Sequence, residues 1–190
     1  MAITFDDGFE NFREHALPLL SEFRIPATVF VVSGYCGRKN DWPSQSTKVP
    51  RLPLMTWSAL KEVVSAGCDL GAHTVTHPNL TGLPRADAER EMRESQIEIE
   101  QRIGLPIRSF AFPYGAVNLT LRALALEQFE RACGTRLDLI TTDASNDCLP
   151  RVDAYYLRNP NELKQLLEPS GQRRLAIRRW ARKARQCLSR

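Results

Sequence analysis

The sequence of 190 residues lacks the marks of a membrane-spanning, exported or disulfide-bonded protein. No apolar run approaches the roughly 20 residues that a transmembrane helix needs, and no basic segment followed by an apolar one marks a signal peptide at the N-terminus. Cysteine is scarce, with five residues and no CxxC pair, which is typical of reduced thiols rather than a disulfide framework. These absences favour a cytoplasmic protein, or one peripheral to the cytoplasmic face of a membrane.

The residues that are present are sufficient for one layered domain. Hydrophobic residues make up 43% of the chain and charged residues 25%, and a chain of this length can bury a full core. Apolar, β-branched segments alternate with segments of helical spacing, which predicts a parallel α/β architecture. Strands are expected at 2–5, 27–32, 69–72, 107–112, 129–133 and 138–141, and helices at 11–23, 57–66, 84–103, 118–127 and 160–167.

Two adjacent aspartates, Asp6 and Asp7, follow the first expected strand. Adjacent carboxylates repel each other, but a metal ion resolves the conflict, because one carboxylate binds the cation while its neighbour stays free as a base. The pair also fits an ordinary turn before Gly8, since Asp and Gly are common turn residues. The sequence further along the chain decides between these two interpretations.

Two of the three histidines, His73 and His77, follow the expected strand 69–72, at a spacing that lets both side chains bind one cation. Taken alone, the pair also fits two strand-end histidines that bond to backbone groups. Together with Asp7 they form a set of two histidines and one carboxylate, which leaves coordination positions open for water and substrate. The set predicts one divalent ion, with zinc as the default for nitrogen and oxygen ligands without sulfur.

Three segments resemble the NodB-type polysaccharide deacetylases. They are TFDDG at Thr4–Gly8, HTVTH at His73–His77 and FAFPYG at Phe110–Gly115, in this order along the chain. The resemblance extends over most of the chain, from about Ile3 to Arg158. The stretch Asp41–Pro43 is most similar to the branch of the family that is associated with exopolysaccharide synthesis.

This resemblance implies an α/β fold, namely an irregular (β/α) barrel of about seven strands. Residues 1–168 would form the catalytic domain, and residues 169–190 a basic amphipathic C-terminal helix or tail. It also implies a metal-dependent hydrolase that removes acetyl groups from the N-acetylated sugars of a polysaccharide or glycan precursor. Two alternatives stay open: a related hydrolase acting on another non-peptide C–N bond, and a carbohydrate-binding protein with weak or no turnover.

The resemblance also assigns roles to matching positions of this sequence. Asp6 would be the general base that takes a proton from the attacking water. Tyr114 would donate its backbone N–H to the developing oxyanion. The remaining assignments are the metal ligands Asp7, His73 and His77, and the substrate-binding residues Trp42, Pro113 and Gly115.

Two departures from the family pattern bear on catalysis. Family members often have an arginine before the Pro-Tyr turn that orients the base aspartate, but this chain has none at 110–113. Arg151 is the candidate replacement for this catalytic role, reaching the site from a later strand, although it also fits a surface arginine beside a proline. Many members also have a late histidine that protonates the leaving amine, but none follows His77, and His15 is expected on a helix surface. We therefore expect Asp6 to return the proton to the amine. The alternative is a compensating acid, for which Asp143, Asp147 and Asp153 are nearby in sequence, and spacing does not choose among them.

The C-terminal residues 172–190 carry eight Lys and Arg residues and no acid. Removing those eight from the 26 basic residues leaves 18 against 22 acidic ones, so the rest of the chain is net acidic. Helical spacing places Ile177, Trp180, Ala184 and Leu188 on one face. The pattern fits a helix on an anionic membrane surface, but packing on the acidic body or fraying is slightly favoured over membrane contact. No motif predicts nucleic-acid binding.

Overall fold

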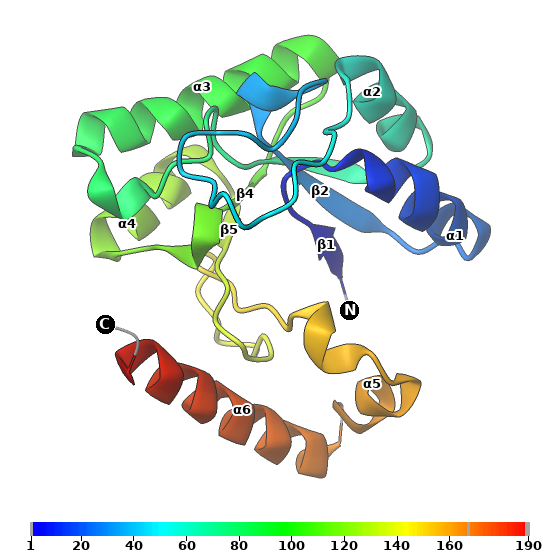
Figure 1. Ribbon diagram of the computed structural model, residues 1–190, viewed down its shortest axis with the longest axis vertical. Coiled ribbons are helices and arrows are strands. Elements are labelled where there is room, and N and C mark those ends of the chain that lie inside the picture. The colour runs from blue at the N-terminus through cyan, green and yellow to red at the C-terminus, as the bar shows by residue number, and fades with distance from the viewer. Residues whose placement is uncertain (1, 167, 189–190) are drawn as a thin grey trace.

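The computed structural model describes residues 2–166 and 168–188, with side chains placed as far as Ala181. Within these residues, five strands form one parallel sheet in the sequential order β1-β2-β3-β4-β5 (Figure 1). The strands are β1 (Ile3–Phe5), β2 (Ala27–Val31), β3 (Asp69–Ala72), β4 (Ser109–Ala111) and β5 (Arg131–Cys133). Because each strand is twisted relative to the one before it, the sheet curls into a half-barrel.

Helices connect the strands and bury their apolar sides against the sheet. They are α1 (Leu17–Glu22), α2 (Trp57–Ser65), α3 (Arg85–Ile103) and α4 (Leu119–Gln128), with short 3₁₀ turns at Ser33–Tyr35, Leu80–Gly82, Pro113–Gly115 and Ala154–Leu157. The helix expected at 11–23 begins instead as a π-helix, Phe12–Ala16, just ahead of Pro18. Proline has no backbone N–H, so the regular hydrogen-bond ladder is interrupted there.

The middle of the sheet is the most deeply buried part of the protein. In β2, Val29, Phe30 and Val31 are each at most 1% exposed. A Cβ atom at Gly71 in β3 would lie 2.5 Å from the Phe30 ring, so only glycine fits against that ring. The close approach of β3 to Phe30 fixes the backbone from which His73 emerges two residues later.

The expected seven strands are not confirmed among the described residues. The segment 138–141, predicted as a strand, is irregular. The Asp138 carboxylate accepts the Leu139 N–H at 3.1 Å, and such a local bond competes with strand pairing. A single parallel bridge between Cys133 and Leu149 continues the sheet beyond β5. The chain therefore has the predicted curled parallel α/β fold, with fewer regular strands.

Two C-terminal helices, α5 (Pro160–Leu166) and α6 (Pro169–Leu188), lie together below the sheet in Figure 1. A small apolar cluster that includes Leu137, Leu166 and Leu175 joins them to the body of the protein. None of the helices described is both long enough and apolar enough to cross a bilayer. The division into a catalytic domain and a tail at residue 168 stays a prediction.

Candidate metal centre and active site

Three side chains expected to bind a metal converge at the C-terminal ends of β1 and β3. Asp7 lies two residues after β1, His73 follows β3 directly, and His77 lies in the loop beyond. Asp7 Oδ1 is 3.3 Å from the Nε2 atom of each histidine, and the two Nε2 atoms are 3.3 Å apart. Both histidines are buried, and the Asp7 side chain is 21% exposed. Three potential ligand atoms therefore surround one point that opens to the surface beside Asp7.

Backbone and ring contacts orient the two imidazoles. His73 Nδ1 lies 2.7 Å from the Ala111 carbonyl oxygen, which accepts only, so Nδ1 carries a proton. In the neutral imidazole, Nε2 is then the nitrogen left free to bind a cation. The His77 ring lies against the rings of Trp42 and Tyr114, with centroid distances of 4.3 and 4.7 Å. Each imidazole is thus held with Nε2 facing Asp7.

The electrostatics of the cluster favour a cation. Burial alone would raise the pKa of Asp7, but hydrogen bonds from His73 and His77 outweigh it and hold that pKa far below its ordinary value. For His73, burial lowers the pKa, and the hydrogen bond to Asp7 and the charge of Asp6 outweigh it, so the net shift is upward. The pKa of His77 is lowered, chiefly by burial. The carboxylate stays ionised, and a positive charge among these groups is stabilised.

Asp6 faces a different partner from that of Asp7. Arg151 donates from Nη1 to Asp6 Oδ1 at 2.6 Å and from Nη2 to Oδ2 at 2.8 Å, a two-pronged pairing of guanidinium and carboxylate. The Arg151 side chain is 17% exposed and also donates to the Gly134 carbonyl oxygen and to Thr4 Oγ1. The bridge from Cys133 to Leu149 places Arg151 at this end of the sheet.

Arg151 and His73 together set the charge state of Asp6. Burial would raise the pKa of Asp6, but the charge of His73 and the hydrogen bonds and charge of Arg151 outweigh it, so the net shift is downward. Asp6 is therefore ionised at neutral pH, and its side chain is 36% exposed. The two adjacent carboxylates have separate surroundings, because Asp7 faces the histidines and Asp6 faces the arginine.

Backbone strain is concentrated at this site. Outside glycine, the described residues with positive φ are few, and four of the five belong to the loops around the cluster. A positive φ is unfavourable for such side chains and persists where surrounding contacts impose it. The four are Asp7 (φ 71°), Thr74 (φ 69°), His77 (φ 54°) and Tyr114 (φ 59°).

One contact that braces the histidine loop was not predicted from the sequence. Glu91 on α3 accepts the backbone N–H groups of Val75 and Thr76 at 2.8 and 2.9 Å, and the Thr76 hydroxyl at 2.7 Å. The sequence offers one signal, because Glu91 adjoins the buried stripe of α3 that includes Ala88 and Met92. A carboxylate at the edge of such a stripe has a backbone or charged partner more often than open solvent.

The turn Pro113–Gly115 approaches the cluster from β4. Gly115 and Ala116 donate to the Phe112 and Pro113 carbonyls at 2.9 and 3.1 Å, and these bonds do not use the Tyr114 N–H. A Cβ atom at Gly115 would lie 2.0 Å from Thr135 Oγ1, so this position requires glycine. The backbone of Tyr114 is thereby fixed, while 48% of the residue remains exposed.

Ser44, which the sequence did not single out, links three loops of the site. The Tyr114 hydroxyl donates to Ser44 Oγ at 2.9 Å, and Ser44 Oγ donates to the His77 carbonyl at 2.7 Å. Trp42, two residues earlier, is 1% exposed and packs against His77. The contact between Trp42 and a sugar stays a prediction, because in the structure the Trp42 ring packs against His77.

Other ionisable residues considered from the sequence lie elsewhere or have other partners. His15 is on the first helical segment with its side chain 80% exposed. Asp147 accepts from Nε and Nη2 of Arg122 at 2.8 and 2.7 Å, and Asp153 accepts the Tyr155 N–H at the start of a 3₁₀ turn. Asp143 is exposed. The structure therefore brings Asp6, Asp7, His73, His77 and Arg151 together.

Comparisons with known proteins agree with these sequence patterns. Residues 1–129 match a family model described as polysaccharide deacetylase. The chain is 32% identical over 117 residues to a chitooligosaccharide deacetylase from Sinorhizobium fredii, covering 60% of this chain and 46% of that protein. It is 28% identical over 119 residues to a poly-β-1,6-N-acetyl-D-glucosamine N-deacetylase from Staphylococcus aureus, covering 61% of this chain and 40% of that protein. The chain matches less than half the length of these two curated relatives.

A solved structure supports the fold over nearly the whole chain. The structure of IcaB from Ammonifex degensii is similar with a TM-score of 0.70 and 27% sequence identity, covering 90% of this chain and 72% of that one. At 90% coverage of this chain, the likeness extends beyond residue 129. The curled half-barrel described above is the architecture that the two proteins share.

Proposed function

The chain belongs to the NodB-type polysaccharide deacetylase family, and from this premise we propose that it removes acetyl groups from N-acetylated sugars by metal-dependent hydrolysis. The observation that carries the proposal is the separation of the two neighbouring aspartates, Asp7 among the histidines and Asp6 on Arg151. The names of the two curated relatives favour substrates that contain N-acetylglucosamine. The cleaved bond would be the amide of the acetamido group in a polysaccharide or glycan precursor.

The three proposed ligands fit a tetrahedral divalent ion. Their Nε2 and Oδ1 atoms form a triangle with three edges of 3.3 Å. A tetrahedral ion with bonds of about 2.0 Å holds its ligands about 3.3 Å apart, and bonds of this length are those of zinc to nitrogen and oxygen. We propose that Asp7, His73 and His77 hold one such ion, most simply zinc. When bound, the ion would polarise the acetyl carbonyl and acidify a water molecule.

Asp6 is proposed as the group that moves the protons. Ionised Asp6 accepts the proton of the attacking water, since each of its oxygens keeps a lone pair beside the bond from Arg151. A carboxylic acid whose pKa is lowered gives up its proton readily. Asp6 can therefore pass the proton to the leaving nitrogen, which fits the lack of a histidine after His77.

The turn Pro113–Gly115 and the loop that carries Trp42 complete the proposed site. The Tyr114 N–H, which the turn leaves unused, is proposed to donate to the oxygen of the tetrahedral intermediate. Pro113 and Gly115 hold that turn, and Gly115 also allows the backbone to approach Thr135 closely. We propose that Pro113, Gly115 and Trp42 border the sugar site through this turn and the loop packed against His77.

The proposal is tested by measuring acetate release. Protein loaded with zinc is incubated with oligosaccharides of β-1,4- and β-1,6-linked N-acetylglucosamine, with a formamide and a cyclic ureide as the competing C–N substrates. We expect acetate from the acetylated sugars, loss of release on chelation, and recovery with added zinc. Turnover of the formamide or ureide alone would contradict the proposal and favour the related C–N hydrolase.

Replacing Arg151 is expected to change the pH dependence of acetate release. Arg151→Met removes a positive charge that lowers the pKa of Asp6, so that pKa rises. Because the base must be ionised, activity is lost as the pH falls through this pKa, and the acid limb of the kcat profile moves to higher pH. Arg151→Lys keeps the charge and is the control, with a smaller displacement. If the acid limb lies at the same pH in the unaltered chain and in both variants, Arg151 does not influence the pKa of the catalytic base.

Glu91→Gln is expected to loosen the histidine loop. The carboxylate of Glu91 accepts three hydrogen bonds, from two backbone N–H groups and one hydroxyl. An amide has only one acceptor oxygen, so at least one of these donors loses its partner. We expect the free energy of unfolding to fall by about 1–3 kcal/mol and zinc affinity to fall by about 10- to 100-fold. Glu94→Gln, at an exposed position on the same helix, is the matched control. Unchanged zinc affinity in Glu91→Gln would show that the loop does not depend on this carboxylate.

A further inference from the structure

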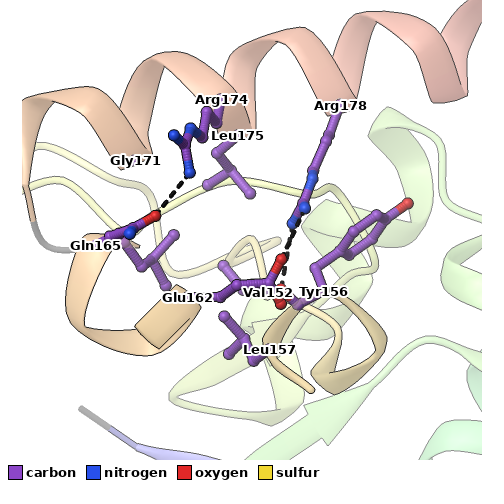
Figure 2. Close-up of a pocket in the computed structure, with 10 residues that line it drawn as sticks. Val152, Tyr156, Leu157, Glu162, Gln165, Gly171, Arg174, Leu175 and Arg178 are labelled. Atoms are coloured by element: carbon purple, nitrogen blue, oxygen red, sulfur yellow. Dashed lines mark hydrogen bonds and ion pairs between the residues drawn. The ribbon is translucent and has the colours of Figure 1, made fainter. Parts of the chain in front are cut away.

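The inner side of α6 is fixed by the body of the protein. Leu175 is 4% exposed and belongs to the apolar cluster with Leu137 and Leu166. Arg178 donates to Glu162 at 2.9 Å and to the Tyr156 carbonyl at 3.2 Å (Figure 2). Arg174 donates to Gln165 at 2.6 Å across the same junction, as Figure 2 also shows. These contacts determine which side of α6 remains outside.

The outer side of α6 carries an exposed apolar stripe. Ile177 is 66% exposed and Trp180 is 74% exposed, although both are large apolar residues. They are three positions apart, so they lie on one face of the helix, turned away from Leu175. The sequence continues the same spacing with Ala184 and Leu188. We refer to the exposed pair Ile177 and Trp180 as the outer stripe.

Charge around the outer stripe has one sign. α6 contains six arginines and one lysine and no acidic residue. Arg173 is exposed and lies four positions before Ile177, on the same face of the helix. Without residues 172–190 the rest of the chain has an excess of four acidic residues over basic ones, 22 against 18. The excess of basic over acidic residues therefore lies in the C-terminal segment, where Arg178 and Arg179 pair with Glu162 and Asp138 and Arg173 is exposed.

The outer stripe and the basic residues of α6 together indicate which kind of partner this helix binds. Two copies that paired through their outer stripes would bring like charges together, which opposes association. A nucleic acid would use the arginines but would leave the apolar residues in water. The surface of an anionic bilayer accommodates both, because tryptophan and aliphatic side chains enter the headgroup boundary while arginines meet the lipid phosphates.

We propose that α6 binds the surface of an anionic bilayer and lies in its plane, with Ile177 and Trp180 inserted at the headgroup boundary. The helix rests on the surface and does not span the bilayer, consistent with its many charges. Such a placement would hold the protein at a membrane without a lipid anchor. The inference depends on α6 alone, so it stands or fails independently of the proposed deacetylation.

The test uses the full chain and vesicles of stated composition. Vesicles of phosphatidylcholine with about one third phosphatidylglycerol are compared with phosphatidylcholine alone, by co-sedimentation and by tryptophan fluorescence. The other tryptophans are not exposed: Trp42 is 1% exposed and Trp57 is partly buried. A blue shift on binding therefore reports Trp180. We expect binding to the anionic vesicles alone, and weakening at high salt because charge attraction is screened.

Two variants test whether vesicle binding depends on the outer stripe or on any exposed apolar side chain. Trp180→Ala should weaken binding to the anionic vesicles about tenfold or more, since the variant loses a large interfacial ring. Leu119→Asn changes a residue on α4 that is 79% exposed, and it should bind as the unaltered chain does. Because both positions are exposed, both variants should melt at the temperature of the unaltered chain.

Three results would overturn the proposal. The first is equal binding to neutral and anionic vesicles, or binding to neither. The second is equal binding by Trp180→Ala and Leu119→Asn. The third is a different partner for the stripe: a dimer seen by sedimentation velocity, or a gel shift of a short DNA duplex, that is lost in Trp180→Ala while vesicle binding is unchanged. Any of these would assign α6 another role.

Discussion

Asp6→Asn is expected to lower kcat for acetate release by about 10⁴-fold, with KM changed far less. General acid–base catalysis contributes roughly 10²- to 10⁴-fold, and the upper end applies where one carboxylate carries both proton transfers. Asn has nearly the same shape and keeps an oxygen that can accept one bond from Arg151. The loss would therefore be chemical rather than structural. The measurement is steady-state acetate release from an acetylated glucosamine oligosaccharide.

The matched control for this variant is Asp143→Asn. Asp143 is exposed and was one of the alternative proton donors considered from the sequence. It should retain the activity and the melting temperature of the unaltered chain. If Asp6→Asn keeps more than about a tenth of the activity, Asp6 is not the base. If Asp143→Asn is the variant that loses activity, the proton passes through that carboxylate instead.

His73→Gln is expected to lower zinc affinity by more than about 100-fold. Acetate release should fall as well, because less of the protein carries the metal. Loss of a partner behind a ligand typically costs 10- to 100-fold in metal affinity, and loss of the ligand atom should cost more. Glutamine is of comparable size, which limits the cavity left at a residue only 2% exposed. Affinity is measured by competition with a chromogenic chelator, and the effect should exceed that of Glu91→Gln.

Two controls keep this result interpretable. The melting temperature of the metal-free variant shows whether the buried position still folds. His15→Gln changes an imidazole that is 80% exposed and should bind zinc as the unaltered chain does. A metal-free variant that melts normally and binds zinc within about threefold of the unaltered chain would remove His73 from the ligand set.

The sequence predicted those parts of the site in which chemistry depends on residue type and spacing. The TFDDG and HTVTH segments follow strands, and parallel strands bring their C-terminal ends to one edge of the sheet. The prediction that Asp7, His73 and His77 approach one another follows from this topology. The parallel sheet followed from the alternation of strands and helices.

Contacts made across long stretches of sequence were harder to predict. Arg151 was a candidate partner of Asp6 only through the family resemblance, because the contact depends on the single bridge that continues the sheet at Leu149. The contacts of Glu91 and Ser44 depend likewise on how a helix and a loop pack on the histidine segment. The segment 138–141, expected as a strand, is irregular, and the local Asp138–Leu139 bond there competes with strand pairing in a way that strand propensity does not take into account.

The separate roles of Asp6 and Asp7 are tested most directly by comparing zinc content in Asp6→Asn and Asp7→Asn, purified and reconstituted side by side. The two residues are neighbours in sequence, but Asp6 faces Arg151 and Asp7 faces both histidines. We expect about one zinc per chain in Asp6→Asn and far less in Asp7→Asn, with little acetate released by either. Equal zinc content in the two variants would contradict the separate roles of the two aspartates.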